Sequence, residues 1–299
     1  MKKLLTSGFF ALTFLLMLLT GCAAAPAQQE SGRLNVTVSI LPEKYFVERI
    51  GGDKVQVNVM VGPGDSPHTY EPKPEQMAAL SRSRVYFAIG VEFEGAWLEK
   101  FRSANPEMVL VDVSGSIEKI PMEDHHDEGE TEEDDHSGEE LDPHIWTSPE
   151  NTKTIARQIA ETLSEVDGQN ASYYLSNLED LLTEIDQLQI DIKDLLKDKQ
   201  NRQFLVFHPA WGYFAQEYGL EEISIEVGGT EPSASELSAI ITNALANNIR
   251  IVFAQPEFST QIADYIASEI NGKVVLITPL AEDWLENLRL VALSLAENL

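Results

Sequence analysis

The sequence contains a single cysteine in 299 residues and is poor in basic residues. One cysteine excludes an internal disulfide and any zinc ribbon built from several cysteines. Lys and Arg number 21 against 49 Asp and Glu, so the formal net charge is −28. So acidic a chain repels the phosphates of nucleic acids and favours cations as partners. We therefore expect no nucleic-acid partner.

Two active-site patterns are also missing. The helical His-Glu-x-x-His pattern of zinc hydrolases does not occur, and Gly228-Gly229-Thr230 is too short for a phosphate loop and lacks its lysine. Hydrophobic residues nevertheless make up 43% of the chain and charged residues 23%, which is typical of a folded protein. The composition therefore predicts a folded protein, and the sequence has neither the zinc-hydrolase motif nor a phosphate loop.

The first 21 residues have the features of a secretory signal. Two lysines precede an apolar run over residues 4–19, which is short for a transmembrane span. Cys22, the only cysteine, follows this run in a Leu-Thr-Gly-Cys sequence that resembles a bacterial lipobox. The resemblance implies cleavage before Cys22 and its diacylation. Residues 22–32 predict a flexible tether, so we expect a lipid-anchored protein on the outer side of the cytoplasmic membrane.

The folded part alternates strand-like and helix-like segments. Residues 34–40 and 55–61 alternate apolar and polar side chains, as strands do, and 75–82 predicts a short helix. Further strands are predicted at 85–89, 109–113, 204–207, 223–226, 251–254 and 274–277. Further helices are predicted around Tyr45 and Ile50, ending at Gly51, and at 149–166, 211–218, 233–246, 261–270 and 284–298. Such repetition favours an α/β fold with mainly parallel sheets.

The middle of the chain lacks any strand pattern. Apolar residues recur there at steps of three and four, which predicts a long amphipathic helix; they are Leu178, Leu182, Ile185, Leu188, Ile192 and Leu195. We therefore predict two α/β lobes, 33–147 and 201–299, joined by one long rigid helix within a helical region, 148–200.

Three histidines stand apart from the others, each beside a proline: His68, His144 and His208. His68 and His208 come where a strand-like run gives way to a loop. Because ligands collect at the carboxyl ends of strands in open α/β sheets, the three imidazoles are candidates to converge on a metal. Neutral imidazoles suit zinc, copper and nickel, whereas manganese prefers more carboxylate.

Several motifs in order resemble the metal-binding solute receptors of ABC importers, the zinc and manganese receptors called cluster A-I. The motifs are Gly-Pro-Gly-Asp-Ser-Pro-His at 62–68, Asp-Pro-His-Ile-Trp at 142–146, Phe-His-Pro-Ala-Trp-Gly-Tyr-Phe at 207–214, Glu-Pro-Ser at 231–233 and Thr-Pro-Leu at 278–280. The resemblance covers the chain after the lipobox. It implies metal bound between two lobes by His68, His144 and His208, and delivery to a membrane permease.

The chain departs from this family at the fourth ligand. Many members have an aspartate at the position of Thr278, and some zinc members have a glutamate where Pro67 stands here. Glu282, Asp283 or a water molecule is left to complete the site. Manganese receptors commonly replace the third histidine by an acid, so His208 favours Zn²⁺ over Mn²⁺.

An acidic segment, residues 123–140, holds 11 acids and the histidines His125, His126 and His136, with no basic residue. Its composition predicts a solvated loop. In zinc receptors of this family a similar loop precedes the second ligand, and we expect this one to bind metal weakly.

The sequence thus favours a monomeric, non-catalytic receptor that captures divalent zinc for an ABC permease. Two alternatives remain open at this point. Three histidines with an open fourth position also describe a catalytic zinc, as in a hydrolase. The family resemblance also allows a surface adhesin.

Overall fold

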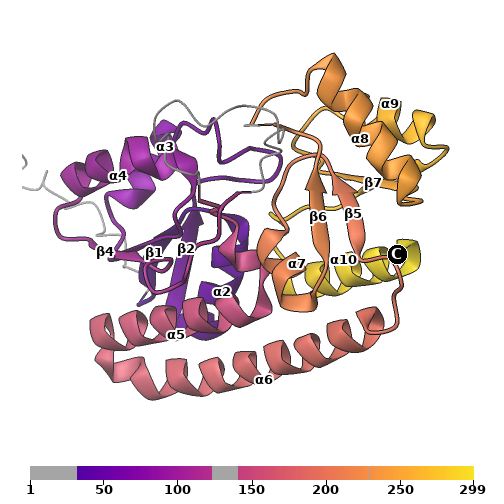
Figure 1. Cartoon of the computed structure of the whole chain (residues 1–299). Helices are drawn as coiled ribbons and strands as arrows, with labels where there is room; N and C mark the ends of the chain where they lie inside the picture. The colour runs from indigo at the N-terminus through magenta and orange to yellow at the C-terminus, as the bar shows by residue number, and fades with distance from the viewer. Residues whose placement is uncertain (1–31, 123–140, 228) are drawn as a thin grey trace, which may run out of the picture. The chain divides into compact units, whose positions relative to one another are not determined.

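The computed structural model describes residues 32–122, 141–227 and 229–299 (Figure 1). Leu34–Leu299 form one compact unit, which holds every element discussed below. The predicted signal and tether, Cys22 and the acidic segment with His125, His126 and His136 lie outside the described residues. No helix in the described ranges has the length and apolar character required to cross a membrane.

The first lobe is built on a parallel sheet with the order β2-β1-β3-β4. Its strands alternate with helices, so each crossover places a helix against a face of the sheet. The elements are β1 (Leu34–Val38), α2 (Leu41–Gly51), β2 (Val55–Val59), α3 (Pro74–Leu80), β3 (Val85–Ala88), α4 (Glu92–Ala104) and β4 (Val109–Asp112). Val36 at the centre of β1 pairs with Val57 on one side and Val85 on the other.

The second lobe repeats this arrangement with the order β6-β5-β7-β8, again all parallel. Its elements are β5 (Gln203–Val206), α7 (Gly212–Tyr218), β6 (Glu221–Ser224), α8 (Ala234–Ala246), β7 (Ile251–Ala254), α9 (Gln261–Glu269), β8 (Lys273–Leu276) and α10 (Trp284–Asn298). Phe204 and Val206 of β5 enter one hydrophobic core and Leu205 enters another. Both faces of the sheet are therefore buried, as parallel sheets require.

Two long helices run side by side (Figure 1): α5 (Pro149–Val166) lies below the first lobe, and α6 (Ala171–Leu196) extends below both lobes. The 26 residues of α6 span about 39 Å at 1.5 Å per residue. Its inward face consists of fully or nearly fully buried side chains three or four positions apart, namely Tyr174, Leu178, Leu181, Ile185, Leu188, Ile192 and Leu196. This stripe packs on α2, α5 and α10, so α6 contacts helices of both lobes.

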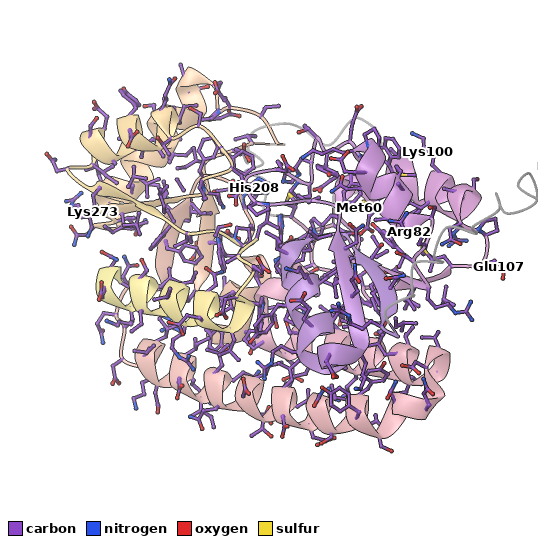
Figure 2. The ribbon with its side chains drawn as sticks, turned by 180° about the vertical axis from the view of Figure 1, so that it is seen from behind. Met60, Arg82, Lys100, Glu107, His208 and Lys273 are labelled. Atoms are coloured by element: carbon purple, nitrogen blue, oxygen red, sulfur yellow. The ribbon has the colours of Figure 1, made fainter. Side chains whose placement is uncertain are left out.

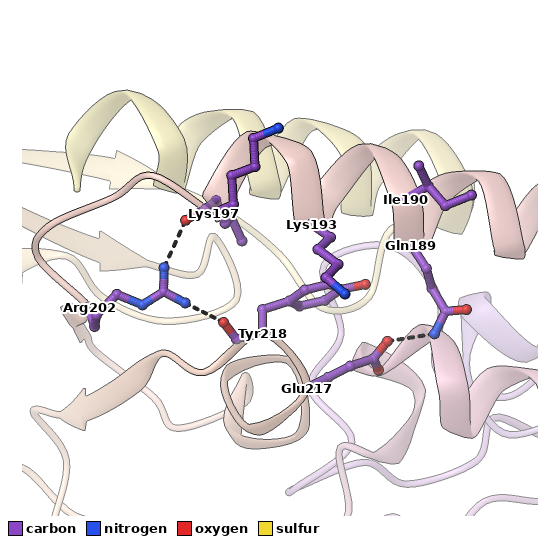
Figure 3. Close-up of a pocket in the computed structure, with 8 residues that line it drawn as sticks. Gln189, Ile190, Lys193, Lys197, Arg202, Glu217 and Tyr218 are labelled. Carbon is purple, nitrogen blue, oxygen red and sulfur yellow. Dashed lines mark hydrogen bonds between the residues drawn. The ribbon is translucent and has the colours of Figure 1, made fainter.

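The C-terminal end of α6 is tied to the second lobe by hydrogen bonds (Figure 3). The Arg202 guanidinium donates to the carbonyl of Leu196 at 2.8 Å and also to the carbonyl of Tyr218. Gln189 on α6 donates to Glu217 on α7 at 2.7 Å. The two Arg202 hydrogen bonds satisfy carbonyls at the C-terminal ends of α6 and α7, which lack partners within their helices.

Two tryptophans connect the lobes behind the histidines. Trp146 Nε1 donates to the carbonyl of Pro279 at 2.8 Å, and Trp284 Nε1 donates to the carbonyl of Trp146 at 2.7 Å. Both indoles are almost fully buried. Since a buried donor without a partner is costly, these two indole hydrogen bonds favour one placement of the segment around Trp146 relative to the segment at Pro279–Trp284.

The predicted fold class is confirmed: two α/β lobes with parallel sheets and a long helix that packs against both. Some details differ. The helix α4 has no counterpart in the sequence prediction, the strand predicted at 223–226 begins two residues earlier, as β6, and the strands predicted at 34–40 and 55–61 end two residues earlier, as β1 and β2. The lobe boundaries at 147 and 200 stay predictions, because Leu34–Leu299 form a single compact unit.

Candidate metal centre

The three predicted histidines come from separate parts of the chain. His68 lies in the loop between β2 and α3, and His208 follows β5 by two residues. His144 directly precedes the 3-10 turn Ile145–Thr147, which leads into α5. Their side chains are 25%, 7% and 3% exposed for His68, His208 and His144 respectively. Each therefore reaches its position from a different loop, and two of them are buried.

The structure brings these three imidazoles together. One ring nitrogen from each lies within 4.8 Å of the others, and among the described residues this is the only such group of three or more potential metal ligands. The Nε2 atoms of His68 and His208 are 3.1 Å apart. Figure 2 shows His208 where the two lobes meet. Nitrogens bound tetrahedrally to one zinc ion stand about 3.4 Å apart, so the cluster is close to a binding geometry.

Behind each histidine stands a carboxylate. The Nδ1 atom of His68 lies 2.9 Å from Glu92 Oε1. The Nδ1 atom of His144 lies 2.7 Å from Asp142 Oδ1. Finally, Nδ1 of His208 lies 2.7 Å from Glu226 Oε2, and both partners are largely buried. Such pairs orient the ring of a metal-binding histidine and raise its basicity.

These pairs determine which nitrogen is available to a metal. An ionised carboxylate only accepts hydrogen bonds, so each Nδ1 carries a proton and each neutral ring presents its Nε2 lone pair. Two lone pairs facing each other at 3.1 Å repel unless a cation or a proton lies between them. The arrangement is therefore suited to a cation, and the three carboxylates supply compensating negative charge.

The acid–base properties of the site agree with this arrangement. Burial lowers the pKa of His208 below its usual value, although the hydrogen bond to Glu226 acts in the opposite direction. Burial by itself raises the pKa of Glu92, but the hydrogen bond and charge of His68 outweigh it and bring the pKa to about 2. His208 therefore remains neutral, and able to bind metal, at a lower pH than an exposed histidine.

The backbone and ring of His208 are held on two further sides. Gln255, which is fully buried, donates to the carbonyl of His208 at 2.7 Å and accepts from its amide at 3.3 Å. Phe258 stacks on the imidazole with the ring centroids 5.0 Å apart. A ligand fixed on all sides loses little conformational freedom when it binds metal.

A cavity of about 10 Å³ lies beside the three ring nitrogens and is bordered by Glu257, Phe258 and Pro279. This volume is about that of one water-sized sphere. A single ion with a small ligand fits such a space, whereas an organic substrate does not.

The two acids that the sequence offered as fourth ligands are engaged elsewhere. Glu282 forms an ion pair with Lys44 of α2 and is half exposed. Asp283 caps α10, where its carboxylate accepts from the amide of Glu286 at 3.2 Å. Neither acid is among the described residues that border the cavity.

Sequence reasoning gave no role to any of the three carboxylates behind the histidines. Asp142 belongs to the Asp-Pro-His motif, but Glu92 and Glu226 are two acids among 49. The available signal was their position just beyond buried strands, since Glu92 follows β3 and Glu226 follows β6. That signal identifies candidates only after the strand order is known.

Comparison with known proteins agrees with the geometry. The pattern of the ZnuA family, described as zinc-uptake complex component A, periplasmic, matches residues 36–298. The chain belongs to this family. Members are transport receptors, so the chain is a binding component and not an enzyme, and it acts outside the cytoplasmic membrane.

Individual relatives span nearly the whole chain. It is 26% identical to the high-affinity zinc uptake system protein ZnuA of Bacillus subtilis over 92% of this chain and 88% of that protein. A crystal structure of ZnuA is 43% identical and covers 89% of this chain and 99% of its own, with a TM-score of 0.82. The laminin-binding protein Lmb of Streptococcus agalactiae, described as a bifunctional adhesin and metal transporter, has a TM-score of 0.77 over the same 89% of this chain and 99% of its own. At 24% identity the likeness to Lmb concerns the fold alone.

Proposed function

We propose that this protein is the zinc receptor of an ABC importer and captures Zn²⁺ with the Nε2 atoms of His68, His144 and His208. The ion is cargo, held between the lobes until it passes to the membrane permease. Membership of the ZnuA family supports zinc uptake by such a complex. The three residues named as ligands are our assignment.

One observation carries the assignment. Each of the three histidines has Nδ1 on a carboxylate, which leaves Nε2 for a metal, and one ring nitrogen of each lies within 4.8 Å of the others. A purely structural histidine does not require a second nitrogen directed at two other imidazoles. Three nitrogen ligands with no carboxylate in the group favour zinc over manganese.

The two alternatives from the sequence find no support. A zinc hydrolase needs room for its substrate beside the metal, and the cavity holds about one water-sized group. An adhesive surface is suggested by no described residue, and the likeness to Lmb extends only to the fold.

We further propose that Cys22 is lipidated and anchors the mature, monomeric receptor to the membrane. The support is the lipobox-like sequence directly after the apolar run. Wild-type protein expressed in bacteria should partition with membranes after lysis, and a Cys22→Ala variant should not. Equal partitioning of the two proteins would contradict the anchor.

The acidic segment at residues 123–140 is proposed to collect zinc near the histidines. Its 11 acids and three histidines offer many carboxylate and imidazole ligands, which favours weak binding and fast exchange of zinc. Deleting the segment should slow uptake at limiting zinc while leaving the affinity of the three-histidine site unchanged. Unchanged uptake at limiting zinc would refute this role.

The ligand assignment is tested by the metal content of protein purified without added metal. Wild type should contain about one zinc per chain, and His208→Ala should contain almost none. Glu269→Ala, at an exposed position on α9, is the control and should match wild type. Stoichiometric manganese in the wild type, or full zinc in His208→Ala, would contradict the assignment.

A further inference from the structure

One carboxylate that borders the cavity has no role in the site described so far. Glu257 follows β7, which lies in the sheet between β5 and β8. The strand order of this lobe reverses between β5 and β7, and in open parallel sheets ligands bind at the carboxyl ends of the strands at such a point. His208 follows β5 and Glu257 follows β7, so the two residues flank this position.

The hydrogen bonding of Glu257 is incomplete. Thr278, just beyond β8, donates its hydroxyl to Glu257 Oε1 at 2.7 Å. The same hydroxyl accepts from the amide of Leu280 at 3.0 Å, which fixes its orientation. The other carboxylate oxygen, Oε2, is buried and has no hydrogen-bond partner within the part of the chain that the structure describes. A buried oxygen without a partner is costly, so it points to a ligand.

The neighbouring acids do not offer the same possibility. Glu92 also has a buried oxygen without a partner, but its other oxygen already holds His68 and it does not border the cavity. Glu282 and Asp283 are used by Lys44 and by the start of α10. Among the described residues that border the cavity, Glu257 is the only carboxylate.

The distances favour contact through water. A carboxylate bound directly to zinc stands about 2.0–2.2 Å from the ion. Glu257 is not in the group whose ligand atoms all lie within 4.8 Å of one another, so it stands outside direct reach of a common metal. The cavity has room for about one water-sized group.

We propose that Glu257, oriented by Thr278, accepts a hydrogen bond from a water molecule that takes the fourth coordination position of the zinc ion. This inference rests on the proposed function, because it assumes zinc on the three histidines. The negative charge of Glu257 favours the cation, and its hydrogen bond holds the water in place. The pair of Thr278 and Glu257 then takes the place of the aspartate that many members of the resembled family have at the position of Thr278.

The test measures the dissociation constant for zinc by competition with a fluorescent chelator. Glu257→Gln should raise it about 10–100-fold, the usual effect of losing a group that orients a metal ligand. Thr278→Val, which removes the donor at similar volume, should raise it roughly 3–10-fold. Glu269→Gln, which removes an exposed charge of the same lobe, should change it less than about 2-fold.

Two further measurements separate this role from a structural one. The melting temperature of the metal-free Glu257→Gln protein should equal that of wild type, because Oε2 has no protein partner to lose. A crystal structure with zinc should show a water molecule about 2.1 Å from the ion and within hydrogen-bond distance of Glu257. Direct bonding of Glu257 to zinc, or no water between them, would overturn the proposal.

The outcome for His208→Ala distinguishes the two levels of inference. Loss of zinc binding in His208→Ala with normal affinity in Glu257→Gln would overturn only the role of Glu257. Normal affinity in both variants would overturn the three-histidine site itself. Normal affinity in Thr278→Val alone would remove Thr278 from the proposal.

Discussion

Replacing Glu226 by glutamine tests how much the carboxylates behind the histidines contribute to zinc binding. The change removes one negative charge and keeps the size of the side chain and an acceptor for the Nδ1 proton of His208. Glu226 Oε2 lies 2.7 Å from that nitrogen, and its side chain is only 10% exposed. A zinc ion bound to Nε2 at about 2.0–2.1 Å would stand roughly 6–7 Å from this carboxylate.

This distance bounds the effect. The attraction between charges of +2 and −1 at roughly 6.5 Å is about 1.3 kcal/mol at the dielectric constant of water and about 5 kcal/mol at an effective value of 20. Removing a group behind a metal-binding histidine costs about 10–100-fold in affinity, or about 1.4–2.7 kcal/mol, which lies between those limits. We therefore expect the dissociation constant of Glu226→Gln to rise about 10–100-fold.

The measurement is a competition titration of metal-free protein against a fluorescent zinc chelator at neutral pH. Glu221→Gln is the matched control, because Glu221 lies on the same strand, β6, and is exposed. It should stay within about 2-fold of wild type. If Glu226→Gln also stays within about 2-fold while His208→Ala loses zinc, the carboxylate does not act through His208 and the reasoning is wrong.

Three more predictions concern pH and the connection between the lobes. Zinc competes with protons for the three imidazoles, so its affinity should fall as the pH drops from about 7 to about 5, the range in which histidines usually protonate, and equal affinities at these two pH values in a titration would contradict neutral imidazole ligands. Burial raises the pKa of Glu94 to about 7, so the folded state keeps a proton that the unfolded state releases above its lower pKa; the free energy of unfolding of metal-free protein should fall as pH rises from about 5 to 8. In urea unfolding, Glu94→Gln should reduce this fall in the free energy of unfolding by about 2–3 kcal/mol, whereas Glu99→Gln, at an exposed position, should leave it unchanged. The same fall in Glu94→Gln as in wild type would show that Glu94 is not the titrating group. Trp284→Phe removes the indole donor from the buried carbonyl of Trp146 and leaves it the longer hydrogen bond from the Thr152 hydroxyl at 3.3 Å, so it should lower the free energy of unfolding by about 1–3 kcal/mol; a loss no larger than that of Trp97→Phe on α4 would argue against the importance of the indole hydrogen bond.

Local periodicity was sufficient for most of the fold. The alternation at residues 34–38 and the spacing of Leu178, Ile185 and Ile192 are properties of neighbouring residues, so they are visible without any tertiary contact. The helix α4 was missed because its apolar stripe is interrupted: Glu94 points inward and is buried with Phe93 and Phe101. A buried acidic residue on the core face of a helix interrupts the amphipathic pattern in the sequence.

The sequence by itself determined the three histidines, because each stands beside a proline in a distinct motif, and it determined the α/β class, because strand and helix periods alternate along the chain. Only the tertiary structure decided which of the 49 acids pair with the Nδ1 atoms of these histidines or border the cavity beside them. Glu226 reaches His208 because β6 lies beside β5, and Glu257 reaches the cavity because β7 lies on the other side. Strand order depends on pairing between distant segments, and the acids gain their roles only once that pairing places them at one edge of the sheet.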